Sequence, residues 1–395
     1  MTPNERRKVL VSVTASVFVT YGCFLFLTPL YPVVAHDLKV GPDTLGAIVG
    51  VASVLSAILQ IPVGIATDRI GRRLFLAGGM VAVAVAQLLR WRAGDATLFT
   101  IAQAVVGLSL PLTASAGYAA VADAYAHSNR AQALGTVTAS ISLGQVGGLL
   151  TAALFGGVID WRTLSLLLVA FPLIVLGPLL LMPEPPRAAT RATAAAQARD
   201  AVRFLFLRQA ATLAAIGALA LGAGIAATYL LPFALREHGA GPGTGGMYLL
   251  PYVVGAMFGP PFAGWIADRA GNRRPMLACI LVGGLMAAVV GVTGPALVAV
   301  VVTFFLMGSS LAAVLSLAAN EILELVSERP GIGTGAALGG LRMGQAVGPA
   351  FGPALAGASY ARGGLSPSFF GIAGALAMAL VLALSAVGRG NPGKD

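Results

Sequence analysis

The chain has 395 residues, of which 57% are hydrophobic and only 10% are charged, and its mean hydropathy is +0.86. Soluble domains carry about 25% charged residues, so this composition excludes a soluble enzyme, a nucleic-acid-binding module and a disordered chain. The formal net charge of +10 could indicate an anionic partner, but in a membrane protein basic residues report topology instead. The composition predicts a chain that crosses a membrane several times.

Twelve charge-poor segments follow one another, each of a size to form a bilayer-spanning helix of about 20 residues. Short connections separate them, so we expect no soluble domain between segments. The first apolar run is longer than the roughly 7–15 residues of a signal-peptide core, which favours an uncleaved helix. The segments are Val9–Ala35, Thr44–Ala66, Leu74–Leu89, Ala96–Ala122, Ala131–Ile159, Thr163–Met182, Ala210–Leu235, Gly245–Ala267, Pro275–Val292, Leu297–Ala319, Gly333–Tyr360 and Ser366–Val387.

The distribution of basic residues predicts the orientation. With the N-terminus in the cytoplasm, 18 of the 25 lysines and arginines fall on the cytoplasmic side and six, Arg90 among them, fall in outer loops. The remaining one, Arg342, lies inside a predicted span. Because cytoplasmic loops carry the excess of Lys and Arg, we expect both termini in the cytoplasm and a multi-pass protein of a bacterial-type plasma membrane.

An internal repeat relates the two halves of the chain at a fixed offset of 200 residues. Asp68 matches Asp268, and Gly144 and Gln145 match their counterparts 200 positions later. The repeat predicts an all-α membrane protein with six-helix bundles over 1–182 and 210–395, related by a pseudo-twofold axis along the membrane normal. The connection 183–209 is a cytoplasmic linker, either a helix on the lipid surface or a solvated segment.

A basic motif follows the second predicted span. It reads Gly64-Ile-Ala-Thr-Asp68-Arg69-Ile-Gly71-Arg72-Arg73, and its copy after the eighth span runs from Gly264 to Arg274. This motif resembles the G-x-x-x-D-R-x-G-R-R signature of the major facilitator superfamily, and the layout resembles its twelve-span drug/proton antiporters. The resemblance covers essentially the whole chain and implies transport by alternating access.

The resemblance also implies a gate latch formed by Asp68, Arg72 and Asp123. In the second half Asn272 replaces the corresponding arginine, so we expect a weaker latch there. The arginines could instead be topology anchors alone. The full set implied in gating is Gly64, Asp68, Arg69, Arg72, Arg73, Asp123, Gly264, Asp268, Arg269 and Arg273.

Glycines in the fifth and eleventh spans resemble the antiporter pattern G-x-x-x-G-P-x-x-G-G. Close helix packing alone would also explain them, because small residues let helices approach in lipid. In the fourth span, Gln103 stands where the family often has an arginine implicated in proton coupling, which puts that part of the mechanism in doubt. The pattern residues are Gly144, Gly148, Gly344, Gly348, Pro349 and Gly352.

Arg342 is an ionisable residue inside a predicted span and is therefore a candidate for substrate binding. It could bind an anionic group, or it could form a structural ion pair with Glu321 or Glu324. The other candidates for a pocket that takes amphipathic molecules are Tyr21, Phe24, Gln145, Tyr229, Tyr248, Tyr252 and Gln345. The candidate proton carriers are Asp123, Glu321 and Glu324.

We therefore expect a secondary-active transporter that exports small amphipathic organic compounds in exchange for protons. The alternative is uptake or export of a specific metabolite or organic anion recognised by Arg342. The chain shows none of the catalytic patterns of a membrane enzyme and no channel-filter repeat. The expected partners are a small-molecule substrate, protons and the lipid bilayer; we expect a monomer with no cofactor, metal or nucleic acid.

Overall fold

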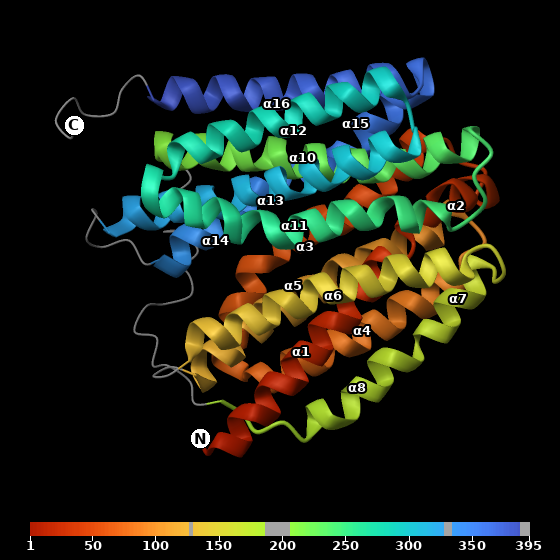
Figure 1. The fold of residues 1–395 in the computed structure, drawn as a ribbon. Helices are drawn as coiled ribbons and strands as arrows, with labels where there is room; N and C mark the ends of the chain where they lie inside the picture. The colour runs from red at the N-terminus through yellow and green to blue at the C-terminus, as the bar shows by residue number, and fades with distance from the viewer. Residues whose placement is uncertain (126–128, 186–205, 328–333, 388–395) are drawn as a thin grey trace. The chain divides into compact units, whose positions relative to one another are not determined.

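A computed structural model of the chain describes residues 1–125, 129–185, 206–327 and 334–387. Every regular element in these residues is helical, which confirms the predicted all-α fold (Figure 1). The first half contains α1 (Pro3–Leu25), η1 (Thr28–Leu30), α2 (Tyr31–Asp37), α3 (Pro42–Ile70), α4 (Arg72–Arg92), α5 (Ala96–Ala124), α6 (Arg130–Phe155), α7 (Trp161–Leu168) and α8 (Ala170–Leu180). The second half contains α10 (Arg208–Glu237), α11 (Thr244–Ala270), α12 (Arg273–Thr293), α13 (Leu297–Ser327), α14 (Thr334–Gln345), α15 (Val347–Gly363) and α16 (Leu365–Val387).

Polar side chains cap the first turns of α1 and α5. Thr2 forms a capping box with Glu5 at the start of α1, and Oδ1 of Asp95 accepts a hydrogen bond from the backbone N of Leu98 at 2.8 Å at the start of α5. Such caps satisfy N–H groups that have no partner within the helix. These caps fix where α1 and α5 begin.

Eleven helices in the described residues are long and apolar enough to cross a membrane. The predicted eleventh segment, Gly333–Tyr360, differs because a turn at Ala346 divides it into α14 and α15. Neither piece reaches the 18 residues of a continuous span. The predicted sixth segment is also interrupted, at Val169, but α7 and α8 together still form one span over Trp161–Leu180.

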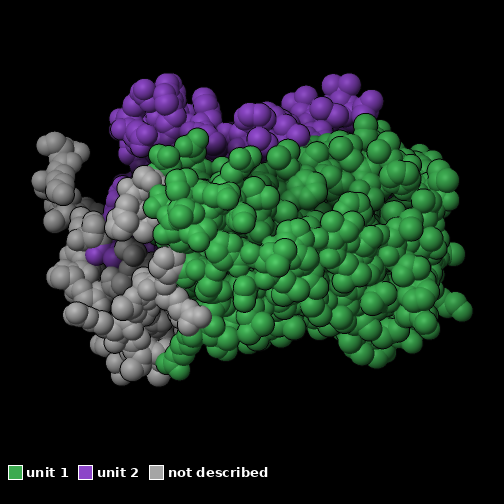
Figure 2. Space-filling view, turned by 90° about the horizontal axis from the view of Figure 1, so that it is seen from below, with its two compact units in different colours: residues 1–41, 48–193, 235–250 green, residues 42–47, 194–234, 251–395 purple. Residues whose placement is uncertain are grey.

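The chain divides into two compact units, coloured separately in Figure 2. Unit 1 comprises residues 1–41, 48–193 and 235–250, and unit 2 comprises residues 42–47, 194–234 and 251–395. In unit 1, α1 packs against α5 and α6, and α4 packs against α5, α7 and α8. In unit 2, α12 packs against α13 and α16. Each unit therefore includes a short segment from the other sequence half. The predicted linker 183–209 lies mostly outside the described residues.

The internal repeat is visible in how these short segments pack. In unit 2, a side chain at Gly46 would collide with the backbone of Pro353. In unit 1, a side chain at Gly246 would collide with the backbone of Leu149 and approach Ala153 to 3.0 Å. Gly246 and Pro353 lie 200 positions after Gly46 and Ala153, so the two contacts are equivalent in the repeat. The same small residue at each position allows the same close backbone approach.

Candidate functional site

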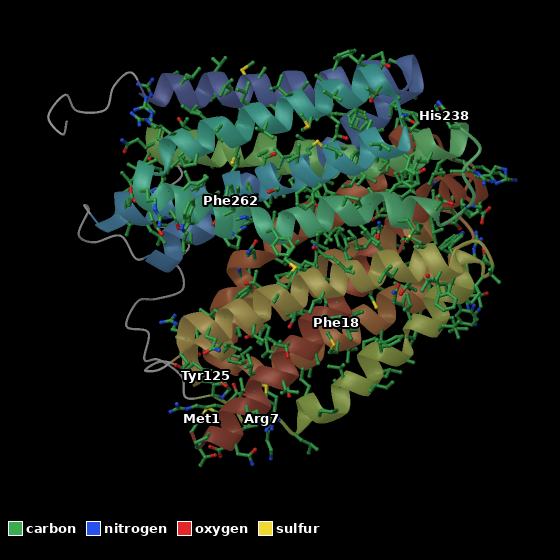
Figure 3. All side chains as sticks on the ribbon, in the orientation of Figure 1. Met1, Arg7, Phe18, Tyr125, His238 and Phe262 are labelled. Carbon is green, nitrogen blue, oxygen red and sulfur yellow. The ribbon has the colours of Figure 1, made fainter. Side chains whose placement is uncertain are left out.

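The turn between α3 and α4 positions the first candidate site. Gly71 has a φ of 132°, a conformation that favours glycine, and α4 begins at the next residue. The Arg72 side chain is buried, and its Nε donates a hydrogen bond to Oδ2 of Asp123 at 3.1 Å. Asp123 lies near the end of α5, close in sequence to Tyr125, which Figure 3 shows at the same end of unit 1 as Met1. An ion pair therefore ties the start of α4 to the end of α5.

Glu184, a carboxylate that the sequence analysis did not select, completes this corner. Its two oxygens accept hydrogen bonds from the backbone N–H groups of Arg72 and Arg73. These are the first N–H groups of α4, where the helix dipole favours a negative charge. Nη1 of Arg73 donates in turn to the carbonyl oxygens of Leu180 and Met182, at 3.3 and 3.4 Å. The end of α8 is thereby held against the start of α4.

The remaining gating candidates of the first repeat contribute less to this network. The side chain of Asp68 lies outside what the structure describes, so its role in the latch stays a prediction. A methyl group at Gly64 would meet no described atom within 4 Å, so this glycine is not at a close helix contact. The side chain of Arg69 is exposed.

The corresponding corner of the second repeat is built around a neutral amide. Nδ2 of Asn272 donates to Oε1 of Glu324 at 2.9 Å and to Oε2 of Glu321 at 3.5 Å. Asn272 occupies the position equivalent to Arg72, and it precedes α12 as Gly71 precedes α4. Two carboxylates here meet an amide instead of a guanidinium, as the substitution in the motif led us to expect.

The other gating candidates of the second repeat lie on the surface of unit 2. The guanidinium of Arg269 stacks on the Trp265 ring at 4.0 Å, and its Nη1 donates to the Trp265 carbonyl at 2.8 Å. Asp268 and Arg273 are exposed, and Gly264 has no described atom near its Cβ position. Arg269 is therefore held by its own helix rather than by a partner on another helix.

An aromatic cluster in unit 2 contains one of the predicted substrate-binding residues. Tyr229 is buried, and its hydroxyl donates a hydrogen bond to the carbonyl oxygen of Pro42, which belongs to the same unit. Its ring packs against Phe233 at 5.4 Å between centroids, and Phe233 packs against Tyr360 at 6.1 Å. The cluster links α10 to α15 and to the first turn of α3.

Gln345 is a predicted binding residue whose side-chain amide is buried without a hydrogen-bond partner. The side chain is 1% exposed, and neither Oε1 nor Nε2 has a hydrogen-bond partner among the described residues. A side chain at Gly217 would collide with this amide, so α10 carries glycine where Gln345 approaches it. Because a buried amide without partners costs free energy, Gln345 is a candidate for binding a polar group of a ligand.

The remaining binding candidates occupy less distinctive positions. Tyr252 packs against Gly224 and forms an edge contact with Phe304 at 6.2 Å. Phe24 packs on the apolar cluster of Ala52, Ala86 and Val106 in unit 1. The other three candidates are partly buried; they are Tyr21, Gln145 and Tyr248.

The structure shows different surroundings for Arg342 and Arg90. Arg342 lies on α14, and its side chain is exposed. Arg342, Glu321 and Glu324 are all described by the structure, and no ion pair joins the arginine to either glutamate. Arg90, which we expected in an outer loop, lies within α4 and is only 1% exposed. The predicted boundary at Leu89 is wrong because α4 continues to Arg92. The deeply buried arginine is therefore Arg90.

The glycines of the antiporter-like pattern lie at close helix contacts. In unit 1, a side chain at Gly144 or Gly148 would collide with backbone atoms of α1. In unit 2, a side chain at Gly348 or Gly352 would come within 3 Å of backbone atoms of α10. Pro349 is buried between them, and Gly344 is partly buried. These contacts explain the small residues by packing, whatever further role they have in transport.

Asp37 and Arg162 form a second polar corner of unit 1. Oδ2 of Asp37 accepts hydrogen bonds from Nη1 of Arg162 and Nε1 of Trp161, both at 2.9 Å. The Nε of Arg162 donates to the carbonyl oxygen of Ala93 at 2.9 Å. This corner joins α2, α7 and the end of α4. In the described residues, no group of three His, Cys, Asp or Glu side chains could hold a metal.

Comparison with known proteins decides the family. The sequence model of the Major Facilitator Superfamily matches residues 13–338 and 236–395. This chain belongs to the Major Facilitator Superfamily. Its members of known structure are membrane transporters rather than enzymes, so this member of the superfamily is a membrane transporter. The predicted family and fold class are therefore confirmed.

Sequence relatives are distant and match only in part. An uncharacterized MFS-type transporter, YwfA of Bacillus subtilis, is 26% identical over 155 residues, 38% of this chain and 37% of that one. The multidrug resistance protein MdtM of Salmonella typhimurium is 30% identical over 127 residues, 32% of this chain and 31% of that one. The matched region is thus about a third of each relative, and their activities bear on this superfamily member only as proposals.

Solved structures resemble the fold over nearly its full length. A bacterial homolog of the human lysosomal transporter Spinster has a TM-score of 0.84 at 16% identity, covering 99% of this chain and 100% of that one. The nucleoside transporter NupG has a TM-score of 0.81 at 14% identity, with 96% and 99% covered. The human organic anion transporter MFSD10 has a TM-score of 0.68 at 19% identity, with 97% and 100% covered. These neighbours share the fold and differ in substrate.

Proposed function

We propose that this transporter works by alternating access and exports small amphipathic organic compounds in exchange for protons across a bacterial-type plasma membrane, with both termini in the cytoplasm. The observation that carries the proposal is an apolar cavity in unit 2, together with the buried, unpartnered amide of Gln345 on the segment that leads into the cavity wall. The multidrug resistance proteins among the sequence relatives support the same substrate class. An amphipathic compound has an apolar body and few hydrogen-bonding groups, and this part of unit 2 offers a match for both.

The cavity has a volume of about 360 Å³ and lies among α10, α15 and α16. Its lining is almost entirely apolar and includes Leu219, Phe351 and Leu355. Ligand pockets of this kind combine apolar walls with a few placed polar groups. Gln345 lies two residues before the lining residue Val347, and its amide contacts Gly217, which directly precedes another lining residue. The unpartnered amide therefore lies close in sequence to two parts of the cavity wall, although Gln345 is not itself a lining residue.

The paired glycine contacts support alternating access. Gly46 packs against Pro353 in unit 2, and Gly246 packs against Leu149 in unit 1, each joining segments from different sequence halves. We propose that these contacts form when the transporter closes on one side of the membrane and separate when it opens there. Because they rest on backbone approach and not on ion pairs, they can separate without exposing buried charge.

Among the three candidate proton carriers, the geometry favours the glutamates of the second repeat. Asp123 is already the counter-ion of Arg72, at 3.1 Å. Glu321 and Glu324 share the amide of Asn272, which brings no positive charge to them. Two carboxylates that lie close together disfavour each other's charged form, so such a pair can hold one proton between its members. We therefore assign proton coupling to the pair of Glu321 and Glu324.

A second candidate function is transport of an organic anion recognised by Arg342. Its exposed guanidinium has no ion pair with Glu321 or Glu324 and is fixed in charge, so it could bind a carboxylate or phosphate with two hydrogen bonds. The organic anion transporter among the structural neighbours shares the fold at a TM-score of 0.68. Arg342 lies three residues before Gln345, so both candidates draw on the same segment of α14.

Inside-out vesicles with an acidic interior test both functions. Amphipathic cations added outside should raise the internal pH of vesicles that contain the protein, because each molecule enters in exchange for protons. Gln345→Leu should weaken this response, whereas Arg342→Gln should leave it unchanged. An anion transporter gives the reverse pattern: uptake of labelled organic anions that Arg342→Gln abolishes. If no compound in a broad panel of cations changes the internal pH, the export proposal is wrong.

A further inference from the structure

We infer that unit 1 contains an anion-binding site centred on Arg90, Gln87 and Gln103. The anion is monovalent, either a halide such as chloride or a carboxylate group. The site is separate from the residues assigned above to substrate binding and proton coupling, and it does not depend on the proposed function.

The first step of the argument is the charge of Arg90. The side chain is 1% exposed inside α4, a predicted span, where a charge without a counter-ion is expensive. Its guanidinium donates to three oxygens: Nη1 to the carbonyl of Cys23 at 2.8 Å and to Oε1 of Gln87 at 3.1 Å, and Nη2 to Oε1 of Gln103 at 2.8 Å. All three acceptors are neutral. Within the described part of the chain, no carboxylate forms an ion pair with Arg90.

The second step is the inventory of hydrogen-bond donors. A guanidinium has only donors, so Gln87 and Gln103 must turn their oxygens toward it and their NH₂ groups away. The structure leaves Nε of Arg90 buried and without a hydrogen-bond partner among the described atoms. The NH₂ groups of Gln87 and Gln103 are buried beside the Cys23 thiol and the Tyr31 hydroxyl, which are a weak acceptor and a neutral one. One guanidinium donor and the positive charge therefore lack a matching acceptor. Buried polar groups are normally satisfied, so a missing acceptor is indicated.

The third step concerns what else surrounds the cluster. The Phe26 ring lies 5.7 Å from the guanidinium carbon, which offers a weak cation–π contact. The Tyr31 hydroxyl and the Cys23 thiol also face the cluster, and both are neutral side chains. A bound water could satisfy one or two donors, but it would leave the positive charge uncompensated. An anion would supply both the acceptor and the charge.

The internal repeat argues that this cluster is not needed for folding. The positions equivalent to Gln87 and Arg90 are Ala287 and Val290, which are fully buried in unit 2. Gln103 is replaced there by Thr303, whose hydroxyl is satisfied by backbone carbonyls of its own helix. The same helix packing is thus achieved in unit 2 with small and apolar side chains. The polar cluster in unit 1 is an addition to the fold, which favours a binding role over a structural one.

Thermal unfolding of the purified full-length protein tests the inference. We expect the Tm to rise and saturate as chloride or acetate replaces a bulky sulfonate salt at constant ionic strength, because a ligand of the native state raises its stability. Arg90→Gln should lose the entire anion-dependent rise. Arg92 is exposed, and its guanidinium lies over the Trp91 ring. Arg92→Gln removes one positive charge as Arg90→Gln does, but this variant should still show the anion-dependent rise in Tm. Chloride acting alone identifies an inorganic anion, and acetate acting alone identifies a carboxylate of an organic ligand.

Gln103→Glu provides a test that does not depend on the folding of Arg90→Gln. The new carboxylate lies where Oε1 of Gln103 already contacts the guanidinium at 2.8 Å, so it would serve as a built-in counter-ion. Its Tm without added anion should exceed that of the wild type, and chloride or acetate should raise it no further. The inference is overturned if the wild-type Tm shows no saturable response to either anion. It is equally overturned if Gln103→Glu or Arg90→Gln keeps the full response.

Discussion

The ion pair between Arg72 and Asp123 allows the sharpest test of the corner at the start of α4. The two side chains are only 8% and 15% exposed, so removing one partner leaves the other charge buried and uncompensated. Breaking such a pair costs about 3 kcal/mol. We expect Arg72→Gln and Asp123→Asn each to lower the free energy of unfolding by about this amount. Glu184 should remain in place, because backbone N–H groups hold it.

The double variant decides whether the loss comes from the pair itself. With both charges removed, an amide faces an amide, and no buried charge is left without a partner at this contact. The double variant should therefore lose far less than the sum of the two single variants, giving a large favourable coupling in a double-mutant cycle. Denaturant unfolding of the purified protein measures all four forms. Arg7→Gln, which removes an exposed charge from α1 in the same unit, should change stability by less than about 0.5 kcal/mol. If the double variant loses as much unfolding free energy as the two single variants together, Arg72 and Asp123 do not form a direct pair.

Glu184→Ala should remove the carboxylate cap of α4 and destabilise the protein by about 1 kcal/mol, measured as a fall in unfolding free energy; an unchanged value would mean that the cap does not form. Gly148→Ala should be strongly destabilising because its Cβ would meet the backbone of Gly22 and Phe26, and overpacking costs about 1–3 kcal/mol. The neighbouring Gly147→Ala should be neutral or stabilising, because its Cβ would meet only the Phe18 ring, at 3.5 Å. Equal Tm values for the two alanine variants would contradict this reasoning.

Features set by local composition could be predicted from the sequence. Apolar runs predict spans because backbone groups in lipid must bond within a helix, and eleven of the twelve predicted segments coincide with candidate spans in the described residues. The break at Ala346 could not be predicted in this way, since the surrounding sequence remains apolar. The offset of 200 residues also identified positions, such as Gly46 and Gly246, that the structure places in equivalent contacts.

Features that depend on distant contacts could not be predicted. Glu184 acts on a helix that begins 112 residues earlier, and nothing near it in sequence indicates that role. Arg90 stands near the end of an apolar run beside Trp91 and Arg92, where a charge normally marks the membrane surface. Only the neighbouring helices reveal that it is buried, because Gln103 and the Cys23 carbonyl come from α5 and α1. The exposure of the Arg342 side chain likewise could not be read from its position within an apolar run.

The two repeats keep the same backbone packing but differ in their buried polar groups, and this difference locates function. Glycines at helix contacts recur at equivalent positions, as Gly148 and Gly348 do, because any side chain there would separate the helices. Among the described residues, the buried arginines Arg72 and Arg90 both lie in unit 1, at positions equivalent to Asn272 and Val290. Unit 2 achieves the equivalent helix packing without these two charges, so packing alone does not require them. We infer that the two units serve different functions: unit 1 holds fixed, buried positive charge, and unit 2 holds the apolar cavity and the unpartnered amide of Gln345.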